Sequence, residues 1–383
     1  SLATAIAAQV GTGNLAGAAT ALIGGGPGAI FWMWVSAFFG MSTIYAEATL
    51  AQQYKVKKDG EVTGGPVYYI RAAFKGAFGK ALAAIFAILI VLALGFTGNM
   101  VQSNSIGAAF SEVFSARNIE IPSIVFGLIL AAVIGFIFLG GVNRLASVVE
   151  KIVPIMAGIY IVGSLVLILM NITALPEAIK MIFVGAFNPE AVVGAGAGIA
   201  VREAIRFGVA RGLFSNEAGM GSTPHAHARA KVENPHKQGL AAMISVFIDT
   251  FIILNLTVFS ILTTGVLDSG KEGTALTQAA FTKGFGNFGD IFVAVCLLFF
   301  AFSTILGWHF FGEVNVKYLF GEKAAKFYSI LVIGFVIVGS TLKVQLVWSL
   351  SDFFNGLMVI PNAIALWALS GVVVKICKQY GKK

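Results

Sequence analysis

Charged residues are scarce in this chain: they make up only 11% of its 383 residues, whereas 57% of the residues are hydrophobic. Soluble domains contain about 25% charged residues, so this composition excludes a soluble globular protein and predicts a polytopic membrane protein. The mean hydropathy of +0.87 supports the same conclusion. The formal net charge of +8 does not indicate nucleic-acid binding, because the basic residues lie in alternate loops between apolar segments.

Cysteine is also rare. Cys296 and Cys377 lie far apart in apolar segments, which predicts free, buried thiols and no disulfide framework. The chain has no Walker loop, no G-x-S-x-G elbow and no zinc-protease helix motif, so nothing in it indicates an enzyme. Without a nucleotide site, any pumping must draw on an ion gradient. His225 and His227 have a metal-like spacing, but no carboxylate or cysteine partner stands at a suitable distance, and we expect no metal centre there.

Long apolar runs, by contrast, are abundant. A helix that crosses a bilayer needs about 20 predominantly apolar residues. Ten suitable runs are present: 1–23, 27–54, 79–112, 123–141, 145–172, 194–221, 238–266, 287–318, 325–342 and 344–377. Pro361 and several polar residues in the tenth run predict a kink or a split, and residues 273–284 predict a short surface helix. Because Ser1 already stands inside an apolar run, we expect further residues upstream, including an additional segment.

The basic residues of the loops predict which ends of the spans face the cytoplasm. With the N-terminus inside, most of them fall on the cytoplasmic side, as the positive-inside rule requires. This cytoplasmic set consists of Lys55, Lys57, Lys58, Arg71, Lys75, Lys80, Arg144, Arg229, Lys231, Lys237, Lys317, Lys323, Lys326, Lys375, Lys378, Lys382 and Lys383. The external loops keep only Arg117, Lys180, Lys271, Lys283 and Lys343. We therefore predict a multi-pass protein of the cell membrane whose basic loops and C-terminus are cytoplasmic.

Ten spans divide into two groups of five, at about 1–172 and 194–378. An odd number of spans in each group gives the two groups opposite orientations, which is the inverted-repeat plan of many secondary transporters. We therefore expect one polytopic all-α domain over residues 1–383, in which the first and sixth spans are counterparts. The halves share no clear residue-level identity, so this expectation depends on topology.

The first span contains a glycine-broken polar tetrad, Gly11-Thr12-Gly13-Asn14. Transporters use such broken helices to hold a substrate and its coupling ion near the middle of the bilayer. Close packing of small residues against another helix is the alternative interpretation. If the helix unwinds here, the amides of Thr12 and Gly13 point at a helix N-terminus and suit a carboxylate. Asn14 can then offer its amide oxygen to a cation or an ammonium group.

The sixth span is interrupted as well. It contains the sequence RFGVARG at 206–212 after a glycine-rich stretch at 194–198, and we expect the second helix break there. Glu217 follows near the inner end of this span. An intramembrane carboxylate is a functional candidate, but the two arginines of 206–212 are near enough for an ion pair that fixes an inner gate. Glu47, near the inner end of the second span, has the same two interpretations.

Polar side chains also stand in two other spans. In the third span, Asn99 and Gln102 are costly against lipid and should face the bundle interior, either as substrate contacts or as hydrogen-bonding groups between helices. In the eighth span, the hydroxyl groups of Ser303 and Thr304 are either functional or bonded back to the preceding turn. Trp308 shares a helix face with Thr304 and is either a pocket wall or an interfacial anchor.

These segments resemble those of a known family, the alanine or glycine:cation symporters, also called the sodium:alanine symporter family. The motifs that carry the resemblance are GTGNLAGAATALIGGGPGAIFWMW at 11–34, GGPVYYI at 64–70, GLFSNEAGMGS at 212–222, FAFSTILGW at 300–308 and GEVNVKYLFG at 312–321. They spread over about the whole chain in the family's order, and the first and third are long and specific. The resemblance implies the five-plus-five inverted-repeat fold of the bacterial leucine transporter, in the APC superfamily, with broken first and sixth helices.

The resemblance also implies roles for single residues. The first span looks like the unwound first helix of the neurotransmitter:sodium symporters, in which backbone amides, here those of Thr12 and Gly13, take the substrate carboxylate. A sodium ion would then lie between the first and eighth spans. The implied ligands are the carbonyl oxygens of Ala7, Val10 and Phe300 and the hydroxyl groups of Ser303 and Thr304.

The same likeness places Phe207 and Gly208 at the unwound part of the sixth helix, with Phe207 as a hydrophobic wall over the substrate side chain. Phe207, Trp308 and Gln102 would leave room only for a small side chain, as in alanine or glycine. Asn14 would sit at a second ion position.

The leading hypothesis is therefore a symporter of small neutral amino acids, alanine and glycine above all, that is driven by a sodium gradient through alternating access. Its partners are the amino-acid substrate and the lipid bilayer, with no nucleic acid and no obligate protein partner. Proton coupling through Glu217 or Glu47 stays open, as does transport of D-alanine. An ion channel with a polar pore is one alternative. A membrane amino-acid sensor is another, although the lack of a sizeable soluble domain argues against it.

Overall fold

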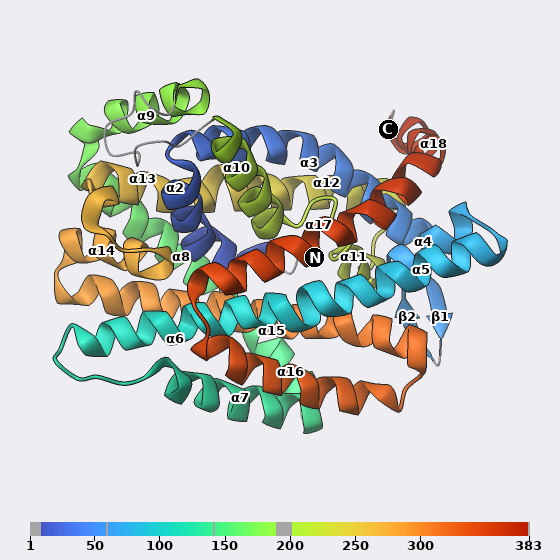
Figure 1. Ribbon diagram of the computed structural model, residues 1–383. Helices are drawn as coiled ribbons and strands as arrows, with labels where there is room; N and C mark the ends of the chain where they lie inside the picture. Colours follow the sequence, from blue (N-terminus) through green and yellow to red (C-terminus); the bar gives the residue numbers. More distant parts are fainter. Residues whose placement is uncertain (1–8, 59, 141, 189–200, 382–383) are drawn as a thin grey trace.

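The computed structural model describes residues 9–58, 60–140, 142–188 and 201–381, with the backbone alone at 140 and 142–152. Apart from loops, the described chain consists of helices and one exposed hairpin (Figure 1). The hairpin pairs β1 (Val56–Lys58) with β2 (Glu61–Thr63) in antiparallel register. It lies in a loop between helices, so the membrane bundle itself is all-α, as predicted.

The first half of the described chain corresponds to predicted spans one to five. Its helices are η1 (Gly13–Gly17), α2 (Ala18–Gly25), α3 (Gly28–Gln53), α4 (Pro66–Ala73), α5 (Gly76–Ile90), η2 (Val91–Gly98), α6 (Asn99–Ser115), α7 (Ser123–Gly140) and α8 (Val142–Met170). The segments α5, η2 and α6 follow one another without a gap and form the third span. Both η1 and η2 are π-helical, a form that is concentrated at functional sites.

Two connecting helices, η3 (Ile172–Ala174) and α9 (Leu175–Phe187), precede the second half. The helices of the second half, in order, are α10 (Val201–Asn216), α11 (Pro224–Arg229), α12 (Pro235–Val246), η5 (Phe247–Leu254), α13 (Asn255–Thr264), η6 (Leu267–Ser269), α14 (Gly273–Phe285), α15 (Asn287–Phe320), α16 (Ala324–Thr341), α17 (Val344–Ala368) and α18 (Ser370–Tyr380). The seventh span is formed by α12, the π-helical η5 and α13.

Seven stretches of described helix are long and apolar enough to cross a membrane. They are Gly28–Gln53, Gly76–Ser115, Val153–Met170, Pro235–Thr264, Asn287–Phe320, Ala324–Thr341 and Val344–Ala368. The apolar helix Ser123–Leu139 is shorter. These helices coincide with predicted runs, and the two remaining runs, the first and the sixth, are those that were predicted to be broken.

Two local predictions need correction. Residues 273–284 do not form a surface helix: Leu276 and Phe281 of α14 are buried, because the apolar face of this helix packs against α15. The tenth run does split, but at Leu369, between α17 and α18, whereas Pro361 lies inside the continuous α17. The additional helix α9 packs against α3.

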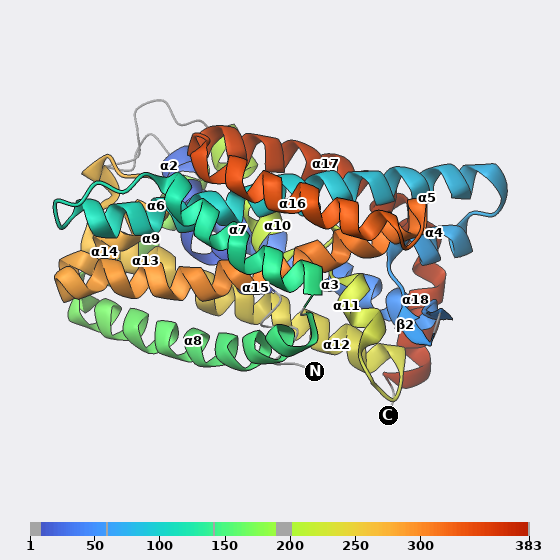
Figure 2. The ribbon, with the colours of Figure 1, turned by 90° about the horizontal axis from the view of Figure 1, so that it is seen from below.

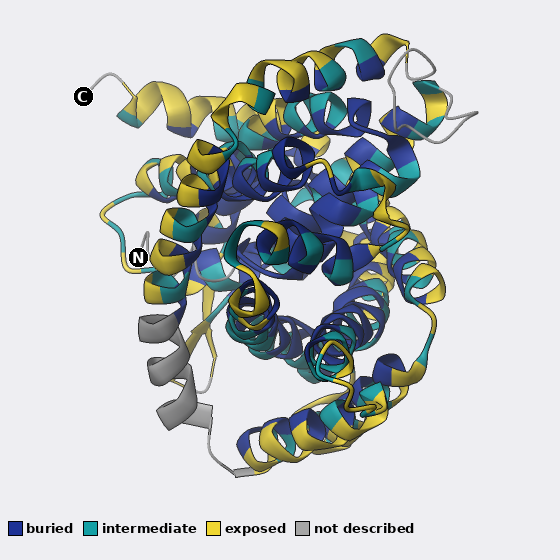
Figure 3. Cartoon of the chain, turned by 90° about the vertical axis from the view of Figure 1, so that its left-hand side faces the viewer, coloured by how far each residue is buried: buried dark blue, intermediate teal, exposed yellow. Residues whose placement is uncertain are grey.

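The bundle has a buried interior and an apolar outer surface. Helices α10 and α12 both pack against α3, α6 packs along α15, and α7 and α16 together cover the lower side of Figure 1 (Figures 1 and 2). Figure 3 shows the outer helices with buried faces inward and exposed faces outward. Phe136 is 79% exposed and Trp367 is 86% exposed, which suits contact with lipid rather than water. Cys296 is buried as predicted, but Cys377 on α18 is exposed, so the prediction of a buried thiol is wrong for Cys377.

Candidate functional site

The first helix is broken at the tetrad. Val10 and Gly11 lie outside helical geometry, and the helix resumes at Thr12 and continues through η1 and α2. The free amide of Gly11 is capped from within the same segment, because its N–H donates to Oδ1 of Asn14 at 2.9 Å. The Asn14 N–H donates to the carbonyl oxygen of Gly11 at 3.2 Å. A side chain three residues into the helix thus reaches back to the first residue, as in a capping box.

The glycines of the tetrad are also points of close contact between helices. A Cβ atom added to Gly11 would lie 2.5 Å from Oγ1 of Thr304 on α15. A Cβ atom added to Gly13 would lie 2.7 Å from Cα of Ser215 on α10. Real Cβ atoms do not come this close to their neighbours, so both positions require glycine. The sequence analysis gave two alternative interpretations of these glycines, a helix break and close packing between helices. Both features occur together in the structure.

The second break lies further along the chain than the sequence predicts. Helix α10 runs without interruption through 206–212, so the expected break there is wrong. The helix ends just before Glu217, and α11 begins after a non-helical stretch. In that stretch Glu217, Gly219 and Gly221 have φ angles of +57°, +96° and +78°. Two of these three left-handed positions are glycine, the residue that adopts this conformation without steric cost.

Phe207 and Gly208 consequently lie in regular helix. A Cβ atom added to Gly208 would lie 2.4 Å from the carbonyl oxygen of Ala29, so this glycine permits the close approach of α10 to α3. The ring of Phe207 packs against Gly24 and Gly25 of α2. The predicted place of both residues at the unwound part of the sixth helix is therefore wrong.

The free backbone of the second break is held by a carboxylate from another helix. Glu47 of α3 is completely buried, and its oxygens accept the N–H groups of Gly219 at 2.9 Å and Gly221 at 2.8 Å. The amide of Asn362 on α17 donates to the same carboxylate at 2.6 Å and to the carbonyl oxygen of Gly219 at 2.9 Å. The Tyr69 hydroxyl donates to Asn362 at 2.5 Å. Glu47 therefore connects α3, the second break and α17.

Glu217 is not paired with either preceding arginine. Its carboxylate accepts the indole N–H of Trp308 at 2.9 Å and a serine hydroxyl of the same break. Arg211 instead pairs with Asp352 of α17 through bonds of 2.5 and 2.7 Å, and Arg206 pairs with a glutamate three residues earlier. The expected ion pair at Glu217 is therefore wrong. Trp308 is 2% exposed and faces the second break, so it is not an interfacial anchor.

A buried polar cluster connects the first break with α6. The hydroxyl group of Thr12 donates to Oε1 of Gln102 at 2.5 Å, and the amide of Asn99 donates to the carbonyl oxygen of Gly95 at 3.0 Å. Within the described part of the chain, Nε2 of Gln102 and Oδ1 of Asn99 have no hydrogen-bond partner. An unsatisfied buried polar atom costs about 1–3 kcal/mol. One donor and one acceptor are therefore available here to a small polar ligand.

Asp249 is a site residue that the sequence analysis missed. It lies in η5, is completely buried, and accepts the amide of Asn14 at 2.8 Å and the hydroxyl group of Ser215 at 3.0 Å. It thereby joins the first break to the end of α10. The available signal was a lone carboxylate inside an apolar span, which is a functional candidate by default. Both amide atoms of Asn14 contact the protein, at Gly11 and Asp249, so Asn14 acts here as a bridge between helices.

The residues implied as sodium ligands lie on two elements that meet. Thr304 of α15 lies against the first break, next to the buried Val10 segment. The hydroxyl groups of Ser303 and Thr304 donate to the carbonyl oxygen of Phe300 at 2.8 and 3.0 Å, which is the back-bonding that the sequence left open. Ala7 lies outside the described residues.

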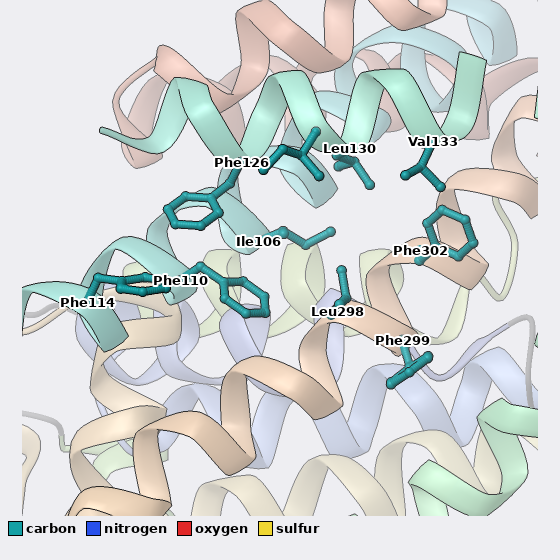
Figure 4. A pocket seen from close by; sticks show the side chains of 10 residues that line it. Ile106, Phe110, Phe114, Phe126, Leu130, Val133, Leu298, Phe299 and Phe302 are labelled. Atoms are coloured by element: carbon teal, nitrogen blue, oxygen red, sulfur yellow. The ribbon is translucent and has the colours of Figure 1, made fainter. Parts of the chain in front are cut away.

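A cavity of about 490 Å³ lies between α6, α7 and α15, and none of its lining residues belongs to either break (Figure 4). Its lining side chains, among them Phe126, Leu298 and Phe302, are all apolar. Ligand sites for polar molecules need a few polar groups that fix the orientation of the ligand, and these side chains supply none. This cavity is therefore not the amino-acid site.

Two broken helices that meet buried polar groups inside an apolar bundle define the class of secondary transporters. The fold agrees: the chain is similar to MhsT in complex with L-phenylalanine, with a TM-score of 0.63 and 15% identity over 95% of this chain and 87% of MhsT. This similarity supports the leucine-transporter-like fold that was predicted.

The family is equally well defined. A sequence model of the sodium:alanine symporter family matches residues 1–383, and the chain belongs to this family of transporters. It is 43% identical to the amino-acid carrier protein AlsT of Bacillus subtilis, over 98% of this chain and 78% of AlsT. It is 42% identical to the sodium/alanine symporter AgcS of Methanococcus maripaludis, over 100% of this chain and 83% of AgcS. The predicted family is confirmed.

Proposed function

We propose that this chain carries small neutral amino acids, alanine and glycine above all, together with sodium ions across the cell membrane by alternating access. The observation that carries the proposal is the buried polar cluster at the first break, where Gln102 and Asn99 each keep one polar atom without a partner in the described chain. An amino acid that bonded to both atoms would remove their desolvation cost. The family and the names of AlsT and AgcS support the choice of substrate and ion.

The substrate carboxylate binds, in this proposal, to the backbone amides of Thr12 and Gly13, where the first helix resumes and its dipole is positive. Glu217, beside Trp308, supplies an acceptor for the ammonium group. Trp308 and Gln102 limit the space for the side chain to a methyl group or a hydrogen atom. Such a site recognises the carboxylate and the ammonium group of its ligand and leaves only a small space for the side chain. It would therefore also accept D-alanine.

Sodium binds, in this proposal, between the first break and α15. The carbonyl groups of Ala7, Val10 and Phe300 and the hydroxyl groups of Ser303 and Thr304 are its ligands. The contact of Thr304 with the first break supports this site. The Thr304 hydroxyl oxygen and a backbone carbonyl oxygen of the first span both lie close to Gly11. An ion that joins the two elements favours the conformation in which they touch, in proportion to its differential affinity for that conformation.

Thr304→Ala tests this ion site. Uptake of labelled alanine into proteoliposomes is measured over a series of sodium concentrations, and the half-saturating concentration should rise about tenfold if the lost ligand contributes about 1.4 kcal/mol. Thr341→Ala is the matched control, because the Thr341 hydroxyl also bonds back to a carbonyl oxygen of its own helix but is exposed on α16. An unchanged sodium dependence in Thr304→Ala would rule out the assigned ligand.

Proton coupling is the second candidate for the driving force. Glu47 is poorly suited to carry a proton, because Gly219, Gly221 and Asn362 all present donors to its carboxylate. Glu217 is the better candidate for this role. Uptake under a pH gradient without sodium decides between the two ions. Accumulation driven only by the pH gradient would mean that a proton, carried by a carboxylate, is the coupling ion. No accumulation under either gradient brings back the channel and sensor hypotheses.

The basic loops and the C-terminus face the cytoplasm in this proposal, as the distribution of lysine and arginine predicts. Cys377 allows a direct test, because it is exposed on α18 near the C-terminus, whereas Cys296 is buried. A membrane-impermeant thiol reagent should leave Cys377 unmodified in intact cells and label it after permeabilisation. Labelling of Cys377 in intact cells would mean that the C-terminus faces outward, opposite to this proposal. Cys377→Ser supplies the background signal.

A further inference from the structure

A cavity of about 470 Å³ lies between α2, α10, the start of α14 and α17, which are neighbours in Figure 1. We name it the Arg211 cavity, after one of the two arginines that line it. Phe207 lines it, although the resemblance to the family placed this ring at the substrate. The polar cluster of Thr12, Asn99 and Gln102 does not line it. The cavity is therefore separate from the site described above.

The floor of the Arg211 cavity is formed by the Trp348 ring and one ion pair, and further aromatic rings lie behind Trp348 and form a ring layer with it. The Arg211 guanidinium bonds both oxygens of Asp352, at 2.5 and 2.7 Å, and its Cζ atom lies 4.3 Å from the centre of the Trp348 ring. The Trp348 ring lies 4.6 Å from Phe214, which lies 5.2 Å from Trp308. This ring layer ends at the indole that bonds Glu217, so it lies between the floor of the cavity and the second break.

The walls above this floor carry charges of both signs. The side chain of Arg206 is 61% exposed, and its Cζ atom lies 4.6 Å from the centre of the Phe207 ring. Glu272, which also lines the cavity, is exposed, and the side chain of Asp352 is 31% exposed. Glu272 makes no side-chain cap at the start of α14, so it is available to a ligand. Because Arg206, which pairs with Glu203 at 2.8 Å, lines one cavity together with two carboxylates and two aromatic rings, the cavity complements a zwitterion with a small apolar side chain.

We propose that the Arg211 cavity is a second amino-acid site, which holds the substrate before it passes the ring layer to the broken helices. The carboxylate of the amino acid binds Arg206, the ammonium group binds Glu272 and the exposed edge of Asp352, and the side chain lies on Phe207 and Trp348. The choice of an amino acid as the ligand rests on the proposed function. The Arg211–Asp352 pair then opens only when the floor moves, because both of its partners are engaged in the observed conformation.

The test uses a thiol inside the cavity. Ser349 is exposed and lines the cavity, so Ser349→Cys in a Cys377→Ser background places one reactive thiol there. The rate of modification by a charged methanethiosulfonate is measured on the purified full chain in detergent, with and without alanine. At ten times its half-saturating concentration, alanine should slow the modification about tenfold. Lys343→Cys, exposed just before the start of α17 and outside the cavity lining, should show no protection.

Three further variants decide whether the alanine sits in the cavity itself. Protection should persist in Gln102→Leu, which removes the polar cluster of the broken-helix site. It should be lost in Arg206→Gln and kept in Arg202→Gln, an exposed arginine of the same helix that does not line the cavity. Protection that disappears in Gln102→Leu would show a distant closure of the cavity and overturn the proposal, as would the absence of any protection. Alanine uptake is measured in parallel and tests the proposed function. If the chain does not transport alanine but alanine still protects the thiol, the proposed function is wrong and the second site stands.

Discussion

The two helix breaks differ in the origin of the side chains that cap their backbone N–H groups. At the first break the cap comes from the same segment, since the Asn14 side chain reaches back three residues to the amide of Gly11. At the second break two N–H groups are capped from another helix, since Glu47 of α3 bonds Gly219 and Gly221, and Asn362 of α17 bonds Glu47 in turn. A third, the N–H group of Ala218, is capped from the same segment by Oδ1 of Asn216 at 3.0 Å. The Gly11 cap of the first break is therefore local in sequence, whereas the Glu47 cap of the second break comes from a distant helix.

This difference has a functional consequence. Unpaired backbone groups inside a membrane are tolerated only where the protein or a ligand satisfies them. At the second break Glu47 satisfies two N–H groups, so these groups are not available to a substrate. At the first break, within the described chain, Asn14 caps the Gly11 amide, and the neighbouring amides of Thr12 and Gly13 are those that we propose for the substrate carboxylate. The difference supports the amides of the first break, rather than those of the second, as the proposed partners of the substrate carboxylate.

Glu47→Ala should have the largest effect, because it removes the cap of the second break. It leaves the N–H groups of Gly219 and Gly221 and one amide hydrogen of Asn362 without an acceptor, and each buried orphan costs about 1–3 kcal/mol. We expect a clearly lowered thermal midpoint of the purified protein and loss of alanine uptake. Glu47→Gln keeps one acceptor and should lie between this variant and the original chain.

Glu61→Ala, at an exposed carboxylate of the hairpin, is the control for that comparison and should melt like the original protein. If Glu47→Ala melted at the same temperature as Glu61→Ala, the second break would be held by something other than this carboxylate. The distinction between a self-capped break and one that is capped from outside would then be lost.

The same difference explains what could be predicted from the sequence. The first break is visible at 11–14 because its glycines and its cap are adjacent in the chain. The second break was assigned to 206–212, since glycine and arginine in an apolar run look like an interruption, yet Gly208 serves close packing against Ala29. The true break depends on Glu47, which lies 172 residues from Gly219 in sequence. No local pattern reports such a contact.

The spans themselves were readily predicted, because hydropathy depends only on composition within each run. The site was predicted less completely. Thr12 and Gln102 do meet, but Asp249 was overlooked although it binds Asn14. Phe207 was assigned to the substrate pocket, yet it lines a different cavity, since its helix is continuous where an unwound turn was expected. To predict which side chains meet across helices, one must know how the helices pack in the bundle. The periodicity of the sequence does not provide this information.

Asn14→Ala should have the second-largest effect, because it leaves two groups without their partner: the Gly11 amide and one oxygen of Asp249. Each costs about 1–3 kcal/mol when it is buried. The matched control is Asn234→Ala, because Asn234 also caps a helix, α12, but at the exposed surface, where a lost cap costs about 1 kcal/mol. Thermal unfolding of the two variants measures the difference. Equal losses would mean that the first break is an ordinary helix start without a buried bridge to Asp249.

Gly208→Ala and Gly212→Ala give the smallest effects and the sharpest test of where the second break lies. A new Cβ atom at position 208 would meet the Ala29 carbonyl oxygen at 2.4 Å, and such overpacking costs about 1–3 kcal/mol. At position 212 the nearest atom lies at 3.6 Å, an ordinary contact. In a continuous helix Gly212→Ala should therefore gain up to about 1 kcal/mol of helix propensity and keep its uptake. If α10 were unwound at 206–212, both substitutions would reduce stability and transport, because alanine would oppose the unwound backbone at either position.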